Sequence, residues 1–284
     1  LLIIVATVLT HLFGGSSGRE GAALQMGSSI SAYVGRFMRL DDKDERVIKM
    51  CGMAAGFSAL FGTPLAAAVF AMEVVSVGVM YYAAMFPCLL ASLVALMTAQ
   101  ALGGVSEAFL VFGIPQLTPL ALVQVVALGV LCALVAVLFC KVFGILHRFY
   151  ARYLPNPYVR VLVGGFLIKM VLTALTLGAG FKGGEIVPAF FVGATFGCYY
   201  GRFLGLSGSF GAGVGMVAVF CGVTNCPLTS ILLAYELFGG DGLLLFALGC
   251  AVSYMLSGYS GLYSAQKIMY SKLRPEFIAR QSGE

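Results

Sequence analysis

Residues 117–146 read LTPLALVQVVALGVLCALVAVLFCKVFGIL, an apolar run longer than the roughly 20 residues that span a bilayer as a helix. Residues 63–79 and 81–102 form two further apolar runs of about this length. The whole chain is 60% hydrophobic and 10% charged, whereas a soluble globular protein is roughly 25% charged. A membrane β-barrel would instead show segments of about ten residues with alternating polarity. The sequence therefore predicts an all-α, polytopic membrane protein.

Charged residues gather in clusters at the ends of the apolar runs. The net charge is +5, and the basic clusters lie at 36–46, 147–160 and 267–280. Basic clusters beside a span indicate the cytoplasmic side of a membrane rather than a nucleic-acid surface. The eight cysteines are scattered without CxxC or Cys/His spacing, so we interpret them as packing residues rather than disulfides or metal ligands. We expect no metal and no other cofactor.

Two glycine-rich breaks, at 14–18 and 178–184, interrupt the helical pattern at equivalent places in the chain. The helix predicted after each break ends in Gly-Arg-Phe, at 35–37 and at 201–203. Other landmarks recur with a displacement of 163 or 165 positions. The matched pairs are Pro64 and Pro227, Glu73 and Glu236, and Glu20 and Glu185. This regularity predicts one transmembrane domain built from two halves of inverted topology, residues 1–147 and 148–284.

Broken helices at matching places in two halves point to a binding site near the membrane midplane. A helix N-terminus exposes unpaired N–H groups and the positive end of the macrodipole, so it can hold an anion without a cationic side chain. Glu20 stands at such a helix start, where an ionisable residue inside a membrane protein is a functional candidate. Its carboxylate can take the anion's place when ionised and leave when protonated. The alternative is a carboxylate that only caps the helix.

Several motifs resemble those of the CLC anion-transporter family. Gly18-Arg19-Glu20-Gly21 resembles the family's GREGP motif, with Ala22 in place of the usual Pro. Residues 184–188, GEIVP, resemble the GxFxP motif, and residues 261–265, GLYSA, resemble the segment with an anion-contacting tyrosine. The resemblance implies that Glu20 is the gate and that Glu185 is a second proton-coupling carboxylate. The residues that it assigns to the anion are Gly18, Arg19, Gly21, Ile186, Val187 and Tyr263.

Departures from the family pattern bear on the transported ion. The pair Glu185-Ile186 resembles the fluoride-selective branch, which pairs the gating Glu with a second Glu at this position. Val74 follows Glu73, where chloride/proton exchangers usually place an inner proton-carrying Glu. The resemblance therefore implies fluoride export in exchange for protons, with a chloride channel or chloride/proton antiporter as the alternative. Because the chain begins inside an apolar run, we expect its opening helices to precede Leu1. The resemblance places the family's first motif in that segment, and this motif supplies a Ser in chloride members and a Met in fluoride members.

Other candidates have structural interpretations. We expect Glu73 and Glu236 to hold backbone amides of a neighbouring helix, and Gly193, Gly197 and Gly201 to form a face for close helix contact. Glu185 can equally be a satisfied helix-start carboxylate, and Tyr263 a core tyrosine. We recognise neither a nucleophile–base pair nor a metal constellation, so no enzyme is expected. A purely structural scaffold would not need two broken helices with acidic starts. The resemblance further implies a homodimer in the plasma membrane that transports halide and protons through one pore per subunit.

Overall fold

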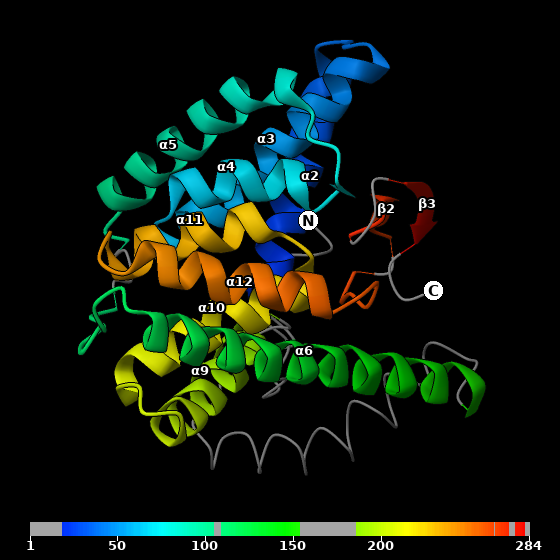
Figure 1. Ribbon diagram of the computed structural model, residues 1–284. Helices are drawn as coiled ribbons and strands as arrows, with labels where there is room; N and C mark the ends of the chain where they lie inside the picture. Colours follow the sequence, from blue (N-terminus) through cyan, green and yellow to red (C-terminus); the bar gives the residue numbers. More distant parts are fainter. Residues whose placement is uncertain (1–18, 105–108, 154–185, 264, 273–275, 282–284) are drawn as a thin grey trace.

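The computed structural model describes residues 19–104, 109–153, 186–263, 265–272 and 276–281. Helices make up most of this part of the chain, which confirms the predicted helical fold (Figure 1). Up to residue 153 they are α2 (Arg19–Phe37), α3 (Asp42–Phe61), α4 (Pro64–Glu73), the short 3-10 helix η1 (Tyr82–Ala84), α5 (Met85–Ala101) and α6 (Pro119–Tyr153), which runs across the predicted boundary between the halves. In the second half they are α9 (Ile186–Phe203), α10 (Gly208–Thr224), α11 (Pro227–Phe238) and α12 (Leu243–Leu256).

The junction between the second and third helices of each half is built in the same way. Helix α3 ends at Gly62, whose φ is 71°, and α4 begins two residues later at Pro64. Helix α10 ends at Asn225, whose φ is 58°, and α11 begins two residues later at Pro227. A left-handed residue ends a helix, and a proline fits the first turn of the next because that turn lacks an N–H partner. The repeat seen in the sequence therefore corresponds to matching turns.

Glycines bring the paired helices of each half into backbone contact. A Cβ at Gly197 of α9 would collide with the carbonyl oxygen of Gly211 of α10. In the first half, a Cβ at Gly27 of α2 would likewise collide with the carbonyl oxygen of Gly52 of α3. Small residues allow this approach where neighbouring side chains would hold helices apart. The predicted close-contact face of α9 is confirmed, and α2 with α3 uses the same device.

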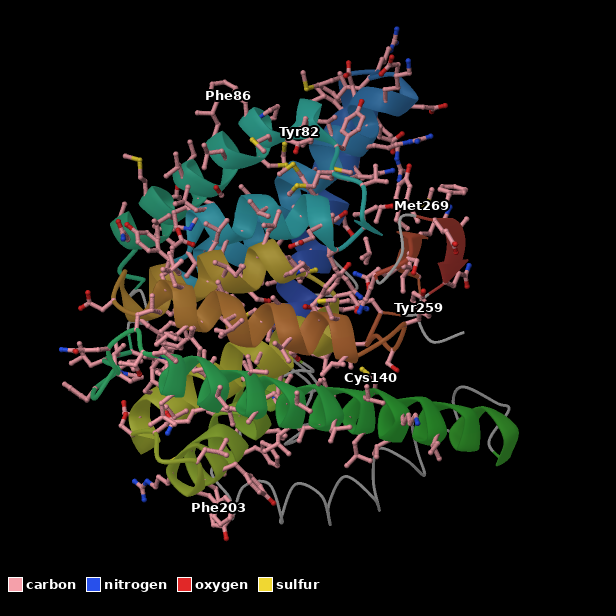
Figure 2. The ribbon with its side chains drawn as sticks, in the orientation of Figure 1. Tyr82, Phe86, Cys140, Phe203, Tyr259 and Met269 are labelled. Atoms are coloured by element: carbon pink, nitrogen blue, oxygen red, sulfur yellow. The ribbon has the colours of Figure 1, made fainter. Side chains whose placement is uncertain are left out.

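The long helices present apolar side chains outward. Within the described ranges, Tyr82–Ala101 and Pro119–Val142 are long and apolar enough to cross a membrane. Tyr82 is 72% exposed and Phe86 is 69% exposed, and Phe86 lies at the outer edge of the molecule in Figure 2. An outward apolar surface of this kind suits lipid rather than water. Positions 147 and 148 both lie in α6, and the division of the domain into halves there stays a prediction.

A small sheet, absent from the helical pattern read in the sequence, accompanies the helices. Strand β1 (Ser76–Val77) pairs in parallel with β2 (Lys267–Tyr270), and β2 pairs antiparallel with β3 (Phe277–Gln281). In Figure 1 the strands β2 and β3 lie beyond the C-terminal end of α12. Because β1 follows α4, the sheet ties the C-terminal segment of the chain to the first half.

Candidate functional site

Helix α2 begins where the first predicted motif stands. Arg19 and Glu20 form its first turn, while Gly18 lies outside the described residues. Gly21 is exposed, and a Cβ built on it would have no described atom within 4 Å. The N–H groups of a first helical turn have no partner inside the helix, so they are available to a ligand or a cap. The predicted helix start is therefore present, and its anion-binding role stays a prediction.

Helix α9 begins at the second predicted motif. Ile186 is 2% exposed and Val187 is half-buried, while Glu185 lies outside the described residues. Pro188, the third residue of the helix, carries no N–H, so the first-turn donors at this end are those of Ile186 and Val187. The aligned peptide dipoles of the 18 residues of α9 place a partial positive charge at these two N–H groups. The end of α9 therefore has the form expected of an anion-binding helix terminus.

One buried cluster joins the sequence motifs in space. Ile186 belongs to it, and Leu24, one turn beyond Glu20 on α2, packs against it. Tyr263 packs against the same cluster from the segment that follows α12. Leu24 of α2, Ile186 of α9 and Tyr263 therefore contact the same interior cluster, and the roles assigned to the motif residues stay predictions.

Phenylalanines fill the interior of this cluster, which motif analysis missed. The ring of Phe70 on α4 lies 4.8 Å from that of Phe57 on α3 and 6.3 Å from that of Phe220 on α10. Phe190 of α9 lies 4.9 Å from Phe220. Phe57 and Phe220 are separated by 163 positions, the displacement of the matched Pro and Glu residues. The internal repeat could therefore have identified Phe57 and Phe220 as equivalent residues from the sequence.

The matched glutamates Glu73 and Glu236 cross-connect the two halves. The Glu73 carboxylate accepts hydrogen bonds from the N–H of Leu228 at 3.1 Å and from the N–H and hydroxyl of Thr229 at 2.9 and 2.7 Å. In return, the Glu236 carboxylate accepts from the N–H groups of Leu65 and Ala66, each at 2.8 Å. Each carboxylate thus caps the N-terminal end of the other half's helix.

This exchange requires α4 and α11 to lie side by side and antiparallel, as Figure 1 shows. An antiparallel pair of equivalent helices is the arrangement that two halves of inverted topology produce. The prediction that Glu73 and Glu236 hold amides of a neighbouring helix is confirmed.

Comparison with known proteins is consistent with this geometry. The family model described as voltage gated chloride channel matches residues 1–168 and 158–258. The chain belongs to this family of CLC proteins. It is 37% identical over 312 aligned residues to a chloride/fluoride channel protein of Pseudomonas syringae pv. tomato, covering 95% of this chain and 69% of that protein.

Solved CLC structures share the fold. A CLC-type fluoride/proton antiporter superposes with a TM-score of 0.84 at 32% identity, over 93% of this chain and 76% of that one. A slow cyanobacterial chloride/proton antiporter superposes with a TM-score of 0.61 at 21% identity, over 85% and 68% of the two chains. The second match is evidence for the fold alone. Together they confirm the predicted all-α CLC fold.

Proposed function

We propose that this CLC protein exports fluoride across the membrane in exchange for protons. The packing of Leu24 of α2, Ile186 of α9 and Tyr263 against one buried cluster carries the proposal, because helix N-termini directed at one region can hold an anion there. The choice of ion is supported by the fluoride/proton antiporter that superposes with a TM-score of 0.84 and by the chloride/fluoride channel protein of 37% identity, whose name includes fluoride. The acidic residue Glu185 before Ile186 supports the same choice.

The N–H groups at the starts of α2 and α9 hold the anion in this mechanism. Amide dipoles bind an ion firmly enough for entry and weakly enough for departure, whereas a fixed Lys or Arg would delay its release. Gly18, Arg19 and Gly21 supply the backbone on the α2 side. Ile186 and Val187 supply it on the α9 side, and the Tyr263 hydroxyl contacts the ion nearer the inner mouth.

Glu20 couples the ion to protons. Its carboxylate competes for the same amides when ionised, and protonation removes the charge that holds it there. Glu185 provides a second carboxyl group at the start of α9. Fluoride, the smallest halide and a strong hydrogen-bond acceptor, accepts hydrogen bonds from protonated carboxyl groups at such a site.

The protein acts in the plasma membrane as a homodimer with one pore in each subunit. Its apolar outward surface and the span-length helices α5 and α6 support insertion in a bilayer. Its halves, residues 1–147 and 148–284, are inverted repeats around the anion site. Halide, protons and lipid are its partners, and the transport mechanism uses no metal or cofactor.

The test is ion flux from liposomes that contain the purified protein. Internal fluoride or chloride is released while an ion-selective electrode and external pH are recorded. We expect fluoride release with proton movement, at least about tenfold slower in Glu20→Gln and Glu185→Gln, as removing one directly acting group often costs that much. Glu276→Gln, at an exposed position, is the matched control and should transport normally.

The family description favours chloride as the alternative ion. Comparable chloride and fluoride release, together with indifference to Glu185→Gln, would replace the fluoride proposal with a chloride channel or chloride/proton antiporter. Normal flux in both glutamate variants would reject the gating roles altogether.

A further inference from the structure

Lys272 follows strand β2 and extends its ammonium group among buried polar atoms. Its Nζ donates to Asn225 Oδ1 at 2.5 Å, to the carbonyl oxygen of Tyr254 at 3.0 Å and to Ser257 Oγ at 3.0 Å. The same nitrogen lies 4.3 Å from the centroid of the Tyr254 ring. The three N–H donors of the lysine ammonium are thus all hydrogen-bonded, and the ammonium also makes a cation–π contact with the Tyr254 ring.

The ammonium lies where two helices end. Asn225 is the C-cap of α10, and Ser257 is the C-cap of α12. Helix C-termini carry partial negative charge, so a cation placed between two of them stabilises both ends. Burial lowers the pKa of Lys272 to about 8, which leaves the ammonium form prevalent at neutral pH.

Asn225 connects Lys272 to the segment that contains Tyr263 through further hydrogen bonds. Its Nδ2 donates to the carbonyl oxygen of Ser260 and to Gln266 Oε1, each at 3.1 Å. The Gln266 backbone N–H donates to the Tyr263 carbonyl at 3.0 Å. Asn225 is fully buried and Gln266 is 2% exposed, so water does not replace these bonds readily.

A second set of bonds attaches the same segment to the end of α10. The N–H of Leu262, directly before Tyr263, donates to the carbonyl of Val223 at 2.8 Å. Gln266 Nε2 donates to the carbonyl of Thr224 at 2.8 Å. Residues on both sides of Tyr263 therefore depend on the geometry of the α10 terminus that Lys272 stabilises. Tyr259, which precedes them, bonds Ser271 beside Lys272 and lies near the sheet in Figure 2.

We propose that Lys272 is a positioning residue that acts through Asn225 and Gln266 to place Tyr263 at the inner end of the anion path. It does not touch the ion. The role given to Tyr263 rests on the proposed function. Its placement by Lys272 rests only on the hydrogen bonds described above. In the sequence Lys272 is one member of the basic cluster 267–280, yet its contacts distinguish it from exposed Lys267 on β2.

A fluorescent reporter tests the placement without any transport assay. The chain contains no tryptophan, so Tyr263→Trp introduces a single reporter. We expect Lys272→Met to shift its emission to longer wavelength and to increase quenching by acrylamide, because the segment leaves the cluster. Lys267→Met is the matched control and should leave both unchanged.

Asn225→Gly provides a second test in case loss of the buried ammonium prevents folding. Glycine accepts the positive φ of this position while removing the side-chain relay. We expect the same spectral change as in Lys272→Met. An unchanged reporter in whichever of the two variants folds would overturn the proposal.

Fluoride flux in variants that retain Tyr263 tests the consequence for transport. We expect Lys272→Met to raise the KM for internal fluoride about tenfold with little change in maximal rate, which is roughly the cost of losing one hydrogen bond to a charged ligand. Lys272→Arg, which keeps the charge, should restore most of the affinity. The proposal would be overturned if Lys272→Arg and Lys272→Met lost fluoride affinity equally. It would also be overturned if the KM of Lys272→Met equalled that of Lys267→Met. Absence of flux in the unmodified protein would reject the proposed function and leave the fluorescence result standing.

Discussion

Gly197→Ala is expected to destabilise the protein by about 3 kcal/mol, at the upper end of overpacking effects. Besides the Gly211 carbonyl oxygen, the new Cβ would lie 2.8 Å from Cα and 3.0 Å from N of Gly215. These are backbone atoms of α10, so relief requires α9 and α10 to separate along their shared face. Such a loss should lower the thermal unfolding midpoint in detergent by roughly 6–12 °C, if it scales as in soluble domains of comparable size.

Gly240→Ala is the matched control for this substitution. Gly240 is exposed, and a Cβ there would meet only the Tyr235 ring, at 3.5 Å, an ordinary contact distance. Its midpoint should stay close to that of the unmodified protein. If Gly197→Ala unfolds at the same temperature as Gly240→Ala, the two helices are not held in backbone contact as described.

The glycine face shows how far a sequence pattern can be taken. Gly193, Gly197 and Gly201 recur every four residues, so they share one side of a helix, and their partner is found only in the structure. The equivalent contact in the first half joins Gly27 to Gly52, and on α2 the small residues Ala23, Gly27, Ser31 and Gly35 recur at the same four-residue spacing. This face was missed because it combines alanine and serine with glycine and so does not form a run of glycines.

Prediction from the sequence succeeded where a residue's structural role followed from the repeat. The displacement of 163 positions paired Glu73 with Glu236, and their amide contacts confirm a common role. The same displacement relates Phe57 to Phe220, but phenylalanine is too common in an apolar chain to attract attention by itself.

No pattern in the sequence predicted the contacts of Lys272 or the small sheet. The ammonium's partner Asn225 lies 47 positions away, and the lysine belongs to a basic cluster typical of a solvated surface. Strand β1 has two residues, too few to show an alternating pattern. Only the packing of the C-terminal segment against the first half and against the ends of α10 and α12 brings these groups together.

Glu73→Gln is expected to destabilise the fold by about 3 kcal/mol. Glu73 is 6% exposed, and its carboxylate accepts three hydrogen bonds at the start of α11, each of which contributes about 1.5–3 kcal/mol because the acceptor is charged. An amide keeps one acceptor oxygen but turns its NH₂ toward a donor of Leu228 or Thr229, which leaves that donor buried and unpaired.

Glu236→Gln is the matched comparison for Glu73→Gln, because the two residues are related by the repeat. Glu236 is half-buried and accepts two bonds rather than three, one of them from exposed Leu65, where water can compensate. The thermal midpoint in detergent should therefore fall further in Glu73→Gln than in Glu236→Gln. The reverse order would mean that exposure does not govern the strength of these caps. If neither variant shifts the midpoint, the carboxylates are not what joins the two halves, and contact between α4 and α11 would then rest on apolar packing alone.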